Sequence, residues 1–314
     1  MSKVSVFISQ ERDPYLNQAL EETLFNTLSA KGQFIFLWTN ADSVVMGKHQ
    51  IPWAEFDVLK AYEEGINIVR RTSGGGAVYH DPGNLNFSFI NWKNDLNIEE
   101  NFSVLIQMLR KLGVEACVNE RKDIIVGGYK ISGSAYRYTK EKAIHHGTLL
   151  IKSDLHRLRR VLKPVFSDLV VSRAVKSVPS EVANLSDFIP IDESDVLEAF
   201  LRSLAKTLNC DPEVMYIDKN TFHETEDLLK LFSSRKWIFG NAPHFKLMIG
   251  RFVFSIADGI IRQIEPLSDS DKNPFMDFLD VTLDPVVFKH IMEISKKEGY
   301  HEERRSVETA FGNS

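Results

Sequence analysis

The chain has 314 residues, of which 43% are hydrophobic and 26% charged, and it carries a net charge of −5. These values are those of an ordinary globular protein, and the length favours one large domain with a smaller one. The acidic balance gives no reason to expect nucleic-acid binding, and no apolar run approaches the ~20 residues of a membrane span.

The N-terminal residues and the cysteines predict the compartment. Residues 1–9 are too short and too quickly polar for a secretory signal, and they lack the arginines of an amphipathic presequence. Two cysteines, Cys117 and Cys210, argue against a disulfide scaffold and suit a reducing compartment. We therefore expect a cytoplasmic protein without a membrane partner.

The first half of the chain predicts helices and strands in alternation. Asp13–Pro14 is typical of a helix start, and Leu16, Leu20 and Leu24 then form one apolar stripe. The predicted strands are Gln33–Trp38, Ser43–Gly47, Ile66–Arg70, Ala77–Tyr79 and Leu85–Ile90. The predicted helices besides the first are Trp53–Glu64 and 102–112, the second ending at Gly113.

The second half predicts a hairpin, a long loop and a smaller unit. Its expected elements are a hairpin of Asp123–Val126 and Tyr129–Ser132, a strand at Ile144–Ile151, helices at Ser194–Leu208, Glu224–Phe232 and Pro285–Lys297, and a hairpin of His244–Ile256 and Ile260–Ile264 around Asp258–Gly259. Pro164 and Pro179 bracket a segment expected to be a long mobile loop. The pattern predicts an α+β fold, a mixed β-sheet sandwich with helices, divided into residues 1–240 and a small α+β unit, 241–314.

A glycine-rich segment carries the strongest functional signal. Arg70 and Arg71 lead through Thr72 and Ser73 into Gly74–Gly75–Gly76, followed by a short strand and His80. Consecutive glycines let a ligand approach the backbone amides, and guanidinium charge beside bare N–H groups favours phosphate or carboxylate. A plain hairpin turn with two surface arginines is the alternative, and we favour an anion site because a lysine motif follows.

That motif surrounds Lys130. Glycines precede the lysine, and Ser132, Gly133, Ser134 and Ala135 follow it without adding bulk. A lysine in such a setting is a compact charge able to bridge two anionic groups. A solvent-facing lysine in a hairpin is the alternative.

His145 and His146 begin a strand, where neighbouring residues point to opposite faces. Only His146 can share a face with Thr148, so the two histidines are not expected to chelate one metal. Core or edge packing is the alternative for His146. His80 and Asn84 are further candidates to orient a ligand, or else to cap a turn.

Common nucleotide-binding and thioester motifs are absent. Lys130 is followed by Ile131, so no G-x-x-x-x-G-K-[ST] sequence occurs, and no G-x-G-x-x-G follows a strand. Neither cysteine lies in a glycine-rich or hydroxyl-rich setting, which weakens a thioester mechanism.

Together the motifs resemble the lipoate–protein ligase A family over about residues 5–260. The matching sequences, in the order and spacing of the family, are Arg70–Asp81 with Gly83–Asn84, Asp123–Ile124, Lys130–Ala135, His145–Leu150, Val45–Lys48, Pro52–Trp53 and the Trp237–Phe245 tail. The resemblance implies a fold like the catalytic domains of biotin–protein ligases and class II synthetases, with a small C-terminal accessory domain.

The resemblance also implies the roles of individual residues. Lys130 matches the family lysine that contacts the acyl carboxylate and the α-phosphate. Arg71 and the backbone of Gly76–Ala77–Val78–Tyr79 match the nucleotide-phosphate site. The residues expected to line the rest of the site are Ser73, Gly74, Gly75, His80, Asn84, Asp123 and His146. No direct protein ligation of a metal is predicted, because Mg²⁺ would be carried by the ATP phosphates, with Asp123 as a candidate contact.

The implied reaction joins lipoate to ATP as lipoyl-AMP and then transfers the lipoyl group to a lysine. The expected acceptors are lipoyl domains of 2-oxoacid dehydrogenase E2 subunits and the glycine-cleavage H protein. The 164–184 segment is the expected cover for the reactive adenylate.

Several alternatives stay open. Pro179 and Glu181 stand where many bacterial ligases carry arginines, and this form is similar to the mitochondrial lipoyltransferases of eukaryotes. A lipoyl amidotransferase that uses preformed lipoyl-AMP or a lipoylated donor, in mitochondria, is therefore the first alternative. A cysteine-dependent octanoyltransferase is disfavoured by the cysteine positions, and a non-catalytic lipoate or adenylate binder is the alternative from another class.

Overall fold

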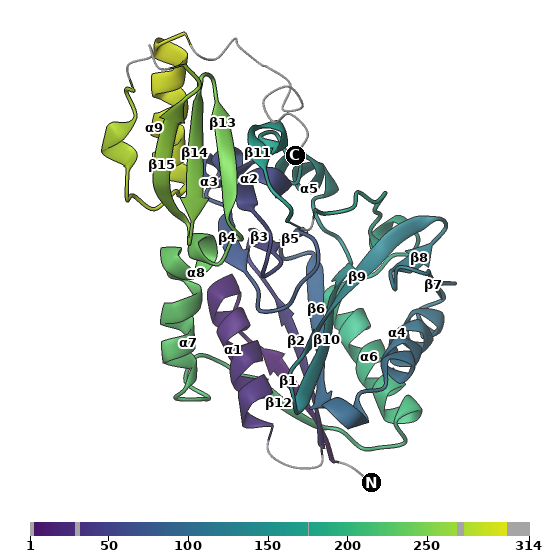
Figure 1. Cartoon of the computed structure of the whole chain (residues 1–314). Helices are drawn as coiled ribbons and strands as arrows, with labels where there is room; N and C mark the ends of the chain where they lie inside the picture. The colour runs from purple at the N-terminus through teal and green to yellow at the C-terminus, as the bar shows by residue number, and fades with distance from the viewer. Residues whose placement is uncertain (1–2, 29–31, 175, 269–272, 300–314) are drawn as a thin grey trace.

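The computed structural model describes residues 3–28, 32–174, 176–268 and 273–299. An eight-stranded sheet forms the body of the molecule, with the strand order β12-β1-β2-β6-β10-β9-β8-β7 (Figure 1). Its strands are β1 (Lys3–Ser9), β2 (Gly32–Thr39), β6 (Asn84–Trp92), β7 (Cys117–Val118), β8 (Ile124–Val126), β9 (Tyr129–Tyr138), β10 (Lys142–Leu150) and β12 (Glu213–Ile217). β1 pairs in parallel with β2 and β12, and the other neighbours are antiparallel. The expected mixed α+β fold is confirmed.

Helices cover both faces of this sheet (Figure 1). α4 (Ile98–Lys111) and α6 (Glu193–Thr207) pack together on one face, and α1 (Pro14–Thr27) and α7 (Thr225–Phe232) pack on the other. α1 begins where Asp13 accepts hydrogen bonds from the first two free amides, and its leucine stripe lies against the sheet. Each face therefore has its own apolar core.

A second, three-stranded sheet lies above one end of the first and carries the glycine segment. It has the order β4-β3-β5 and consists of β3 (Ser43–Met46), β4 (Asn67–Arg70) and β5 (Val78–His80). Three short helices pack around it: α2 (Pro52–Glu55), α3 (Val58–Glu63) and α5 (Leu155–Val161). The glycine segment connects β4 to β5 of this sheet, and its Ser73 contacts His146 on β10 of the large sheet.

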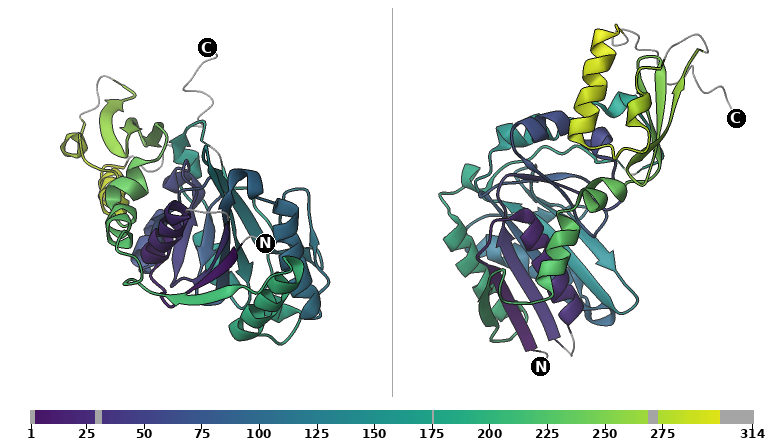
Figure 2. Two further views of the ribbon diagram at one scale, coloured as in Figure 1. Left: turned by 90° about the horizontal axis from the view of Figure 1, so that it is seen from below. Right: turned by 90° about the vertical axis from the view of Figure 1, so that its left-hand side faces the viewer.

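The C-terminal unit stands at the end of the molecule away from the N-terminus (Figure 2). It consists of β13 (Phe245–Ile249), β14 (Phe252–Ala257), β15 (Ile260–Pro266) and α9 (Pro285–Lys297), and it follows α8 (Arg235–Gly240). β11 (Val170–Val171) joins this sheet as its edge strand. The Trp53 ring lies within 6 Å of the rings of Phe245 and Phe288, so one apolar core continues between the units. The division at residue 240 stays a prediction.

Two expected elements are wrong in detail. The helix expected over 53–64 is two short helices, because Phe56 is fully buried in an extended conformation and Asp57 starts the second one by accepting from the Lys60 amide. The strand expected over 244–256 is two strands, since Gly250 adopts a positive φ of 57° and the chain turns there. β1, β12, β7 and β11 are strands that the sequence pattern had not indicated.

No helix among the described residues has both the length and the apolar composition that crossing a bilayer requires.

Candidate active site

The glycine segment has a fixed shape because it packs against the turn after β3. The Arg71 amide donates to the Met46 carbonyl at 3.0 Å, and the Lys48 amide donates to the Ser73 carbonyl at 2.8 Å. A Cβ on Gly47 would lie 2.2 Å from the Gly75 carbonyl oxygen, so only glycine fits there. Gly75 itself has a φ of 93°, which other residues rarely adopt.

The two arginines before the glycines differ in what they bind. Arg71 is buried, and its guanidinium donates to the carbonyls of Val45, Gly74 and Gly76 at 2.6–3.0 Å. It thereby holds the glycine segment in place. Burial lowers its pKa to about 10, with Glu21 acting in the opposite direction, so the side chain stays charged at neutral pH.

Arg70 does not contribute to the site. It is fully buried and donates to carbonyls of the 47–50 turn and to the Ile238 carbonyl at 2.7 Å. Burial lowers its pKa to about 10. The expectation that both arginines flank a ligand is wrong for Arg70. Its guanidinium donates to the Ile238 carbonyl and thereby connects β4 to α8.

The floor of the site consists of side chains in register across four strands of the large sheet. One row crosses β2, β6, β10 and β9 through Trp38, Asn86, Thr148 and Gly133. The next row runs through Phe36, Ser88, His146 and Ala135. The small residues on β9 leave open space above the strand.

Two cavities lie along this floor, between the two sheets. The first has a volume of about 350 Å³ and the second about 420 Å³, both sufficient for a small ligand. His146 lines the first cavity, Thr148 lines both, and Leu150 lines the second, so the cavities follow each other along β10. The residues common to both are Ala77, Val78, Lys130, Gly133, Thr148, Lys176, Ser177 and Val178.

Lys130 thus lies where the two cavities meet. Its Nζ is 2.7 Å from Asp123 Oδ1, and its side chain is 23% exposed against 8% for Asp123. Its amide donates to the Glu181 carbonyl at 2.9 Å, which fixes the strand position. A Cβ on Gly133 would lie 2.8 Å from Lys130 Cε, so glycine there makes room for the lysine side chain.

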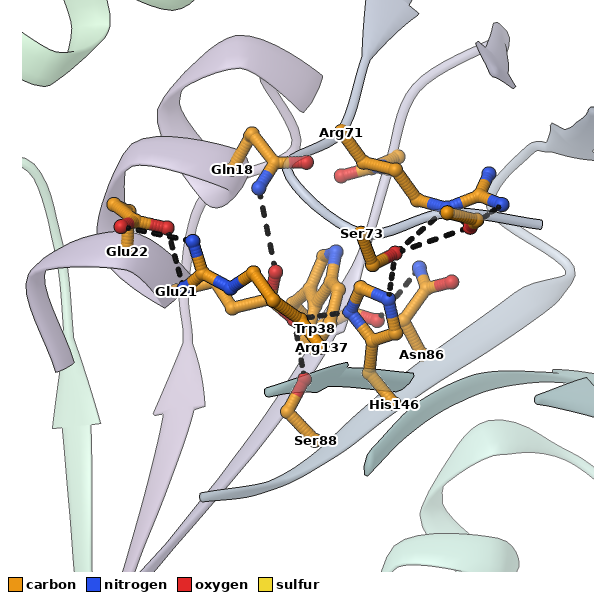
Figure 3. Close-up of polar contacts among 12 residues, drawn as sticks. Gln18, Glu21, Glu22, Trp38, Arg71, Ser73, Asn86, Ser88, Arg137 and His146 are labelled. Atoms are coloured by element: carbon orange, nitrogen blue, oxygen red, sulfur yellow. Dashed lines mark hydrogen bonds and ion pairs between the residues drawn. The ribbon is translucent and has the colours of Figure 1, made fainter. Parts of the chain in front are cut away.

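A buried hydrogen-bond chain connects α1 to the glycine segment, as Figure 3 shows. Glu21 Oε1 accepts from His146 Nδ1 at 2.8 Å and from Ser88, and His146 Nε2 is 2.6 Å from Ser73 Oγ. Ser73 also accepts from Arg71 Nε at 3.0 Å. Burial alone would raise the pKa of Glu21, but the His146 ring, the Ser88 hydroxyl and the Arg137 charge together lower it. His146 is therefore held on both sides.

The sequence-predicted residues divide into three groups. Those that line the first cavity are Arg71, Gly75, Gly76, Ala77, Val78, His80, Asp123, Lys130 and His146. Tyr79 lines only the second cavity, with its hydroxyl 3.1 Å from Asp42 Oδ1. Ser73, Gly74 and Asn84 lie behind the walls: Ser73 contacts His146, Gly74 accepts from Arg71, and Asn84 donates to Asn86 at 2.9 Å.

The segment expected to be a mobile loop contacts the glycine segment. Ser177 Oγ accepts from the Ala77 amide at 2.9 Å and donates to Glu55, and Gln50 also donates to it. Lys176, Ser177 and Val178 line both cavities. Val175, which belongs to the same segment, lies outside the described residues.

The sequence did not indicate several residues that line the first cavity. They are Gln18, Glu21, Trp38, Asn40 and Asn86. A signal exists only for Gln18 and Glu21, which are polar, lie three residues apart on α1 and are buried together with its leucines. Three residues along a helix place two side chains on one face, so a polar stripe beside the leucine stripe could have indicated a second buried contact.

The described residues contain no group of three or more His, Cys, Asp or Glu side chains that could hold a metal ion. Asp123 is a carboxylate in the wall of the first cavity, next to Lys130. This donor set suits a cation such as Mg²⁺ that arrives on phosphates and needs one or two protein carboxylates.

Known proteins resemble this chain in sequence and in structure. Residues 13–205 match the family model of the lipoyl protein ligase A/B catalytic domain. The chain is 34% identical over 285 residues to lipoate-protein ligase A of Bdellovibrio bacteriovorus, covering 86% of this chain and 84% of that protein.

Three solved structures extend the comparison. P. falciparum LipL1 in complex with lipoate has a TM-score of 0.65 at 25% identity, covering 94% of this chain and 99% of that one. The bipartite lipoate protein ligase of Thermoplasma acidophilum, studied with its E2 lipoyl domain, has a TM-score of 0.64 at 25% identity, covering 76% and 96%. A lipoate-protein ligase A bound with ATP has a TM-score of 0.60 at 26% identity, covering 75% and 95%. The match over more than half of the chain and the agreement of fold show that this chain belongs to the lipoyl protein ligase A/B family.

Proposed function

We propose that this protein is an ATP-dependent lipoate–protein ligase. It would join the carboxylate of lipoate to the α-phosphate of ATP, releasing pyrophosphate, and then transfer the lipoyl group to the ε-amine of a lysine on an acceptor protein. The observation that carries this proposal is the position of Lys130 where the two cavities meet.

The reaction needs a positive charge at that place. A carboxylate and a triphosphate repel each other, and a fixed ammonium group between them offsets the repulsion as negative charge develops in the transition state. The Lys130 side chain is 23% exposed, and its ammonium group is paired with Asp123. Its backbone amide donates to the Glu181 carbonyl, which fixes the strand. The ammonium group therefore has a defined position. In the proposed complex, the Lys130 ammonium group would contact the substrates as well as Asp123.

The two cavities suit two different ligands. The first is lined by Trp38 and by the ring of His146, which is held by Glu21, and its volume of about 350 Å³ suits a lipoyl chain. The second is lined by Leu150, Leu158 and Leu162 and by Ala77 at the end of the glycine segment, which suits a nucleoside. Relatives solved with lipoate and with ATP support these two compounds as the ligands.

The glycine segment would orient the phosphates through its amides. In the present structure the Ala77 amide donates to Ser177. A phosphate oxygen can take the place of that hydroxyl once the 176–178 segment moves, which would couple nucleotide binding to the closing segment. Arg71 acts indirectly, because its donors hold the carbonyls of Gly74 and Gly76. The Mg²⁺ carried by the nucleotide would supply further positive charge to the phosphates, with Asp123 as its protein contact.

The acceptors and the unit at the C-terminus belong to the same proposal. The Thermoplasma ligase was studied with its E2 lipoyl domain, which supports E2 subunits as acceptors, and we extend the proposal to the glycine-cleavage H protein. Residues 1–240 would form the catalytic domain and 241–314 an accessory domain.

One experiment separates the ligase from the amidotransferase. ATP, Mg²⁺ and lipoate are mixed with the protein without an acceptor, and pyrophosphate release is followed. A burst of pyrophosphate supports the ligase. If none appears and synthetic lipoyl-AMP still modifies a lipoyl domain, the amidotransferase replaces it. Pro179 in the wall of the second cavity is the residue that favours this second candidate. If neither reaction occurs and lipoate or lipoyl-AMP still binds, the protein is a binder without this activity.

A further inference from the structure

A chain of buried side chains fixes the orientation of the Asn40 amide. Asn17 is fully buried, and its Nδ2 donates to the carbonyls of Glu11 and Thr39 at 3.0 and 3.2 Å. Carbonyls only accept, so this atom is the amide nitrogen. It also lies 2.9 Å from Asn40 Oδ1, which must be the accepting oxygen. Asn40 therefore turns its own amide nitrogen the other way.

The Asn40 nitrogen in turn determines where the proton of His80 lies. Asn40 Nδ2 is 3.0 Å from His80 Nδ1. An amide N–H can only donate, so Nδ1 accepts and carries no proton. Burial, with the Arg71 charge and then His146, lowers the pKa of His80 to about 3, so the ring is neutral near pH 7. Its single proton is then on Nε2.

His80 Nε2 has no hydrogen-bond partner among the described residues. The side chain is only 5% exposed and lines the first cavity. His146, the other buried histidine in that wall, has both ring nitrogens engaged, by Glu21 and Ser73. Of these two rings, His80 alone holds an unused donor. A buried N–H without a partner is costly, which indicates that a ligand atom completes it.

The position of His80 tells which part of a ligand it would meet. Val78, two residues earlier on β5, lines both cavities, whereas His80 lines only the first. Residues two apart on a strand share a face and are separated by roughly 7 Å. His80 is therefore beyond the meeting point at Lys130, where the acyl head group reacts, and beside the chain that follows it.

We propose that His80 Nε2–H is a specificity-determining donor that recognises a sulfur atom in the acyl chain. This inference rests on the proposed function, since it takes lipoate as the occupant of the first cavity. The dithiolane sulfurs of lipoate are weak acceptors, whereas octanoate, which has the same carboxylate and chain length, offers only C–H groups there. The contact favours lipoate over octanoate by roughly three- to tenfold in affinity.

The first test uses the unaltered protein. Long-range ¹H–¹⁵N spectra of ¹⁵N-histidine-labelled protein identify the protonated ring nitrogen of each histidine. We expect His80 to be protonated on Nε2, and its Nε2–H signal to shift with lipoate but not with octanoate. His145 serves as an internal control, because it lines neither cavity and its Nδ1 contacts Asn101 on α4. A proton on Nδ1, or equal shifts with both acids, would overturn the proposal.

The second test compares two amides at position 80. The amide of His80→Gln reaches about as far from Cα as Nε2, so it keeps a donor in the cavity, whereas the amide of His80→Asn reaches only as far as Nδ1. We expect calorimetry without ATP to show that His80→Asn binds lipoate three- to tenfold more weakly and octanoate unchanged, with His80→Gln close to wild type. Equal losses for both acids would indicate a packing role and overturn the proposal.

The two proposals fail differently. If both acids bind equally well to the unaltered protein, the sulfur contact is refuted while the ligase proposal stands. If neither acid binds, both are refuted.

Discussion

Two buried histidines should lower the free energy of unfolding of this protein in mild acid. Burial, together with the Arg71 charge for His80 and the His146 ring for both, lowers the pKa of His80 and of His145 to about 3 from an ordinary value of 6.5. The folded protein keeps both rings neutral, whereas the unfolded chain takes up a proton on each as the pH falls below about 6.5. The unfolded state therefore binds more protons, and acid favours unfolding. This stability is complete above pH 6.5 and decreases toward pH 3.

The size of the effect follows from the pKa values. Each pKa unit is worth about 1.4 kcal/mol, and pH 5 lies 1.5 units below the ordinary histidine value. Each ring should therefore lower the free energy of unfolding by about 2 kcal/mol between pH 7.5 and 5, and the two together by about 4 kcal/mol. That is a large part of a typical total of about 5–15 kcal/mol.

Denaturant unfolding at pH 7.5, 6 and 5 measures this loss. The variants His80→Phe and His145→Phe should each remove about half of it, whatever their stability at pH 7.5, and the double variant should remove nearly all. The measured quantity is the difference between pH values within one protein, so a general loss of stability does not disturb it. If the single variants keep the full loss at pH 5, the buried histidines are not its source and the reasoning is refuted.

Three further predictions concern the site. In Gly133→Ala the new Cβ would lie 2.8 Å from Lys130 Cε, so the ammonium group must move. We expect pyrophosphate release to slow tenfold or more at an unchanged melting temperature. An unchanged rate would contradict the placement of Lys130. In Gly47→Ala the methyl would lie 2.2 Å from the Gly75 carbonyl oxygen, so the backbone must shift to make room for it. We expect calorimetry to show a free energy of unfolding lower by about 1–3 kcal/mol and weaker ATP binding. Wild-type values for both would show that the glycine segment changes its shape at no cost. Protease cutting within residues 164–184 should slow when lipoate and ATP are added, and cutting at the same rate would remove this segment as the cover of the site.

Local patterns predicted the elements whose geometry is local. The hairpin of β8 and β9 follows from Gly127–Gly128, which adopt φ values of 56° and 89° that other residues avoid. The start of α1 follows from Asp13–Pro14 because the cap and the fixed φ act within a few residues. The break at Phe56 has no such signal, since the helix stops to bury one ring in a core that other segments complete.

Contacts between distant residues could not be predicted. Glu21 is an ordinary helical glutamate until β10 brings His146 to within 2.8 Å, 125 residues later. The hydrogen bond from the Ala77 amide to Ser177 joins residues that are 100 positions apart in the sequence. The charges of Arg70 and Arg71 were evident in the sequence, but not that both guanidinium groups are used by backbone carbonyls. The residue types of the site were therefore predictable, whereas their partners depend on tertiary packing.

The central claim is that the Lys130 ammonium group joins the two substrates, and one comparison tests it most directly. Pyrophosphate release from ATP and lipoate is measured for the wild type, for Lys130→Ala and for Lys122→Ala. Lys122 is a matched control, because it lies in the nearby turn between β7 and β8 and its ammonium group pairs with Glu99 at 2.9 Å on the outer surface. We predict that Lys130→Ala loses at least ~100-fold in rate while keeping its melting temperature, and that Lys122→Ala remains active. A Lys130→Ala protein as active as the control would contradict the account.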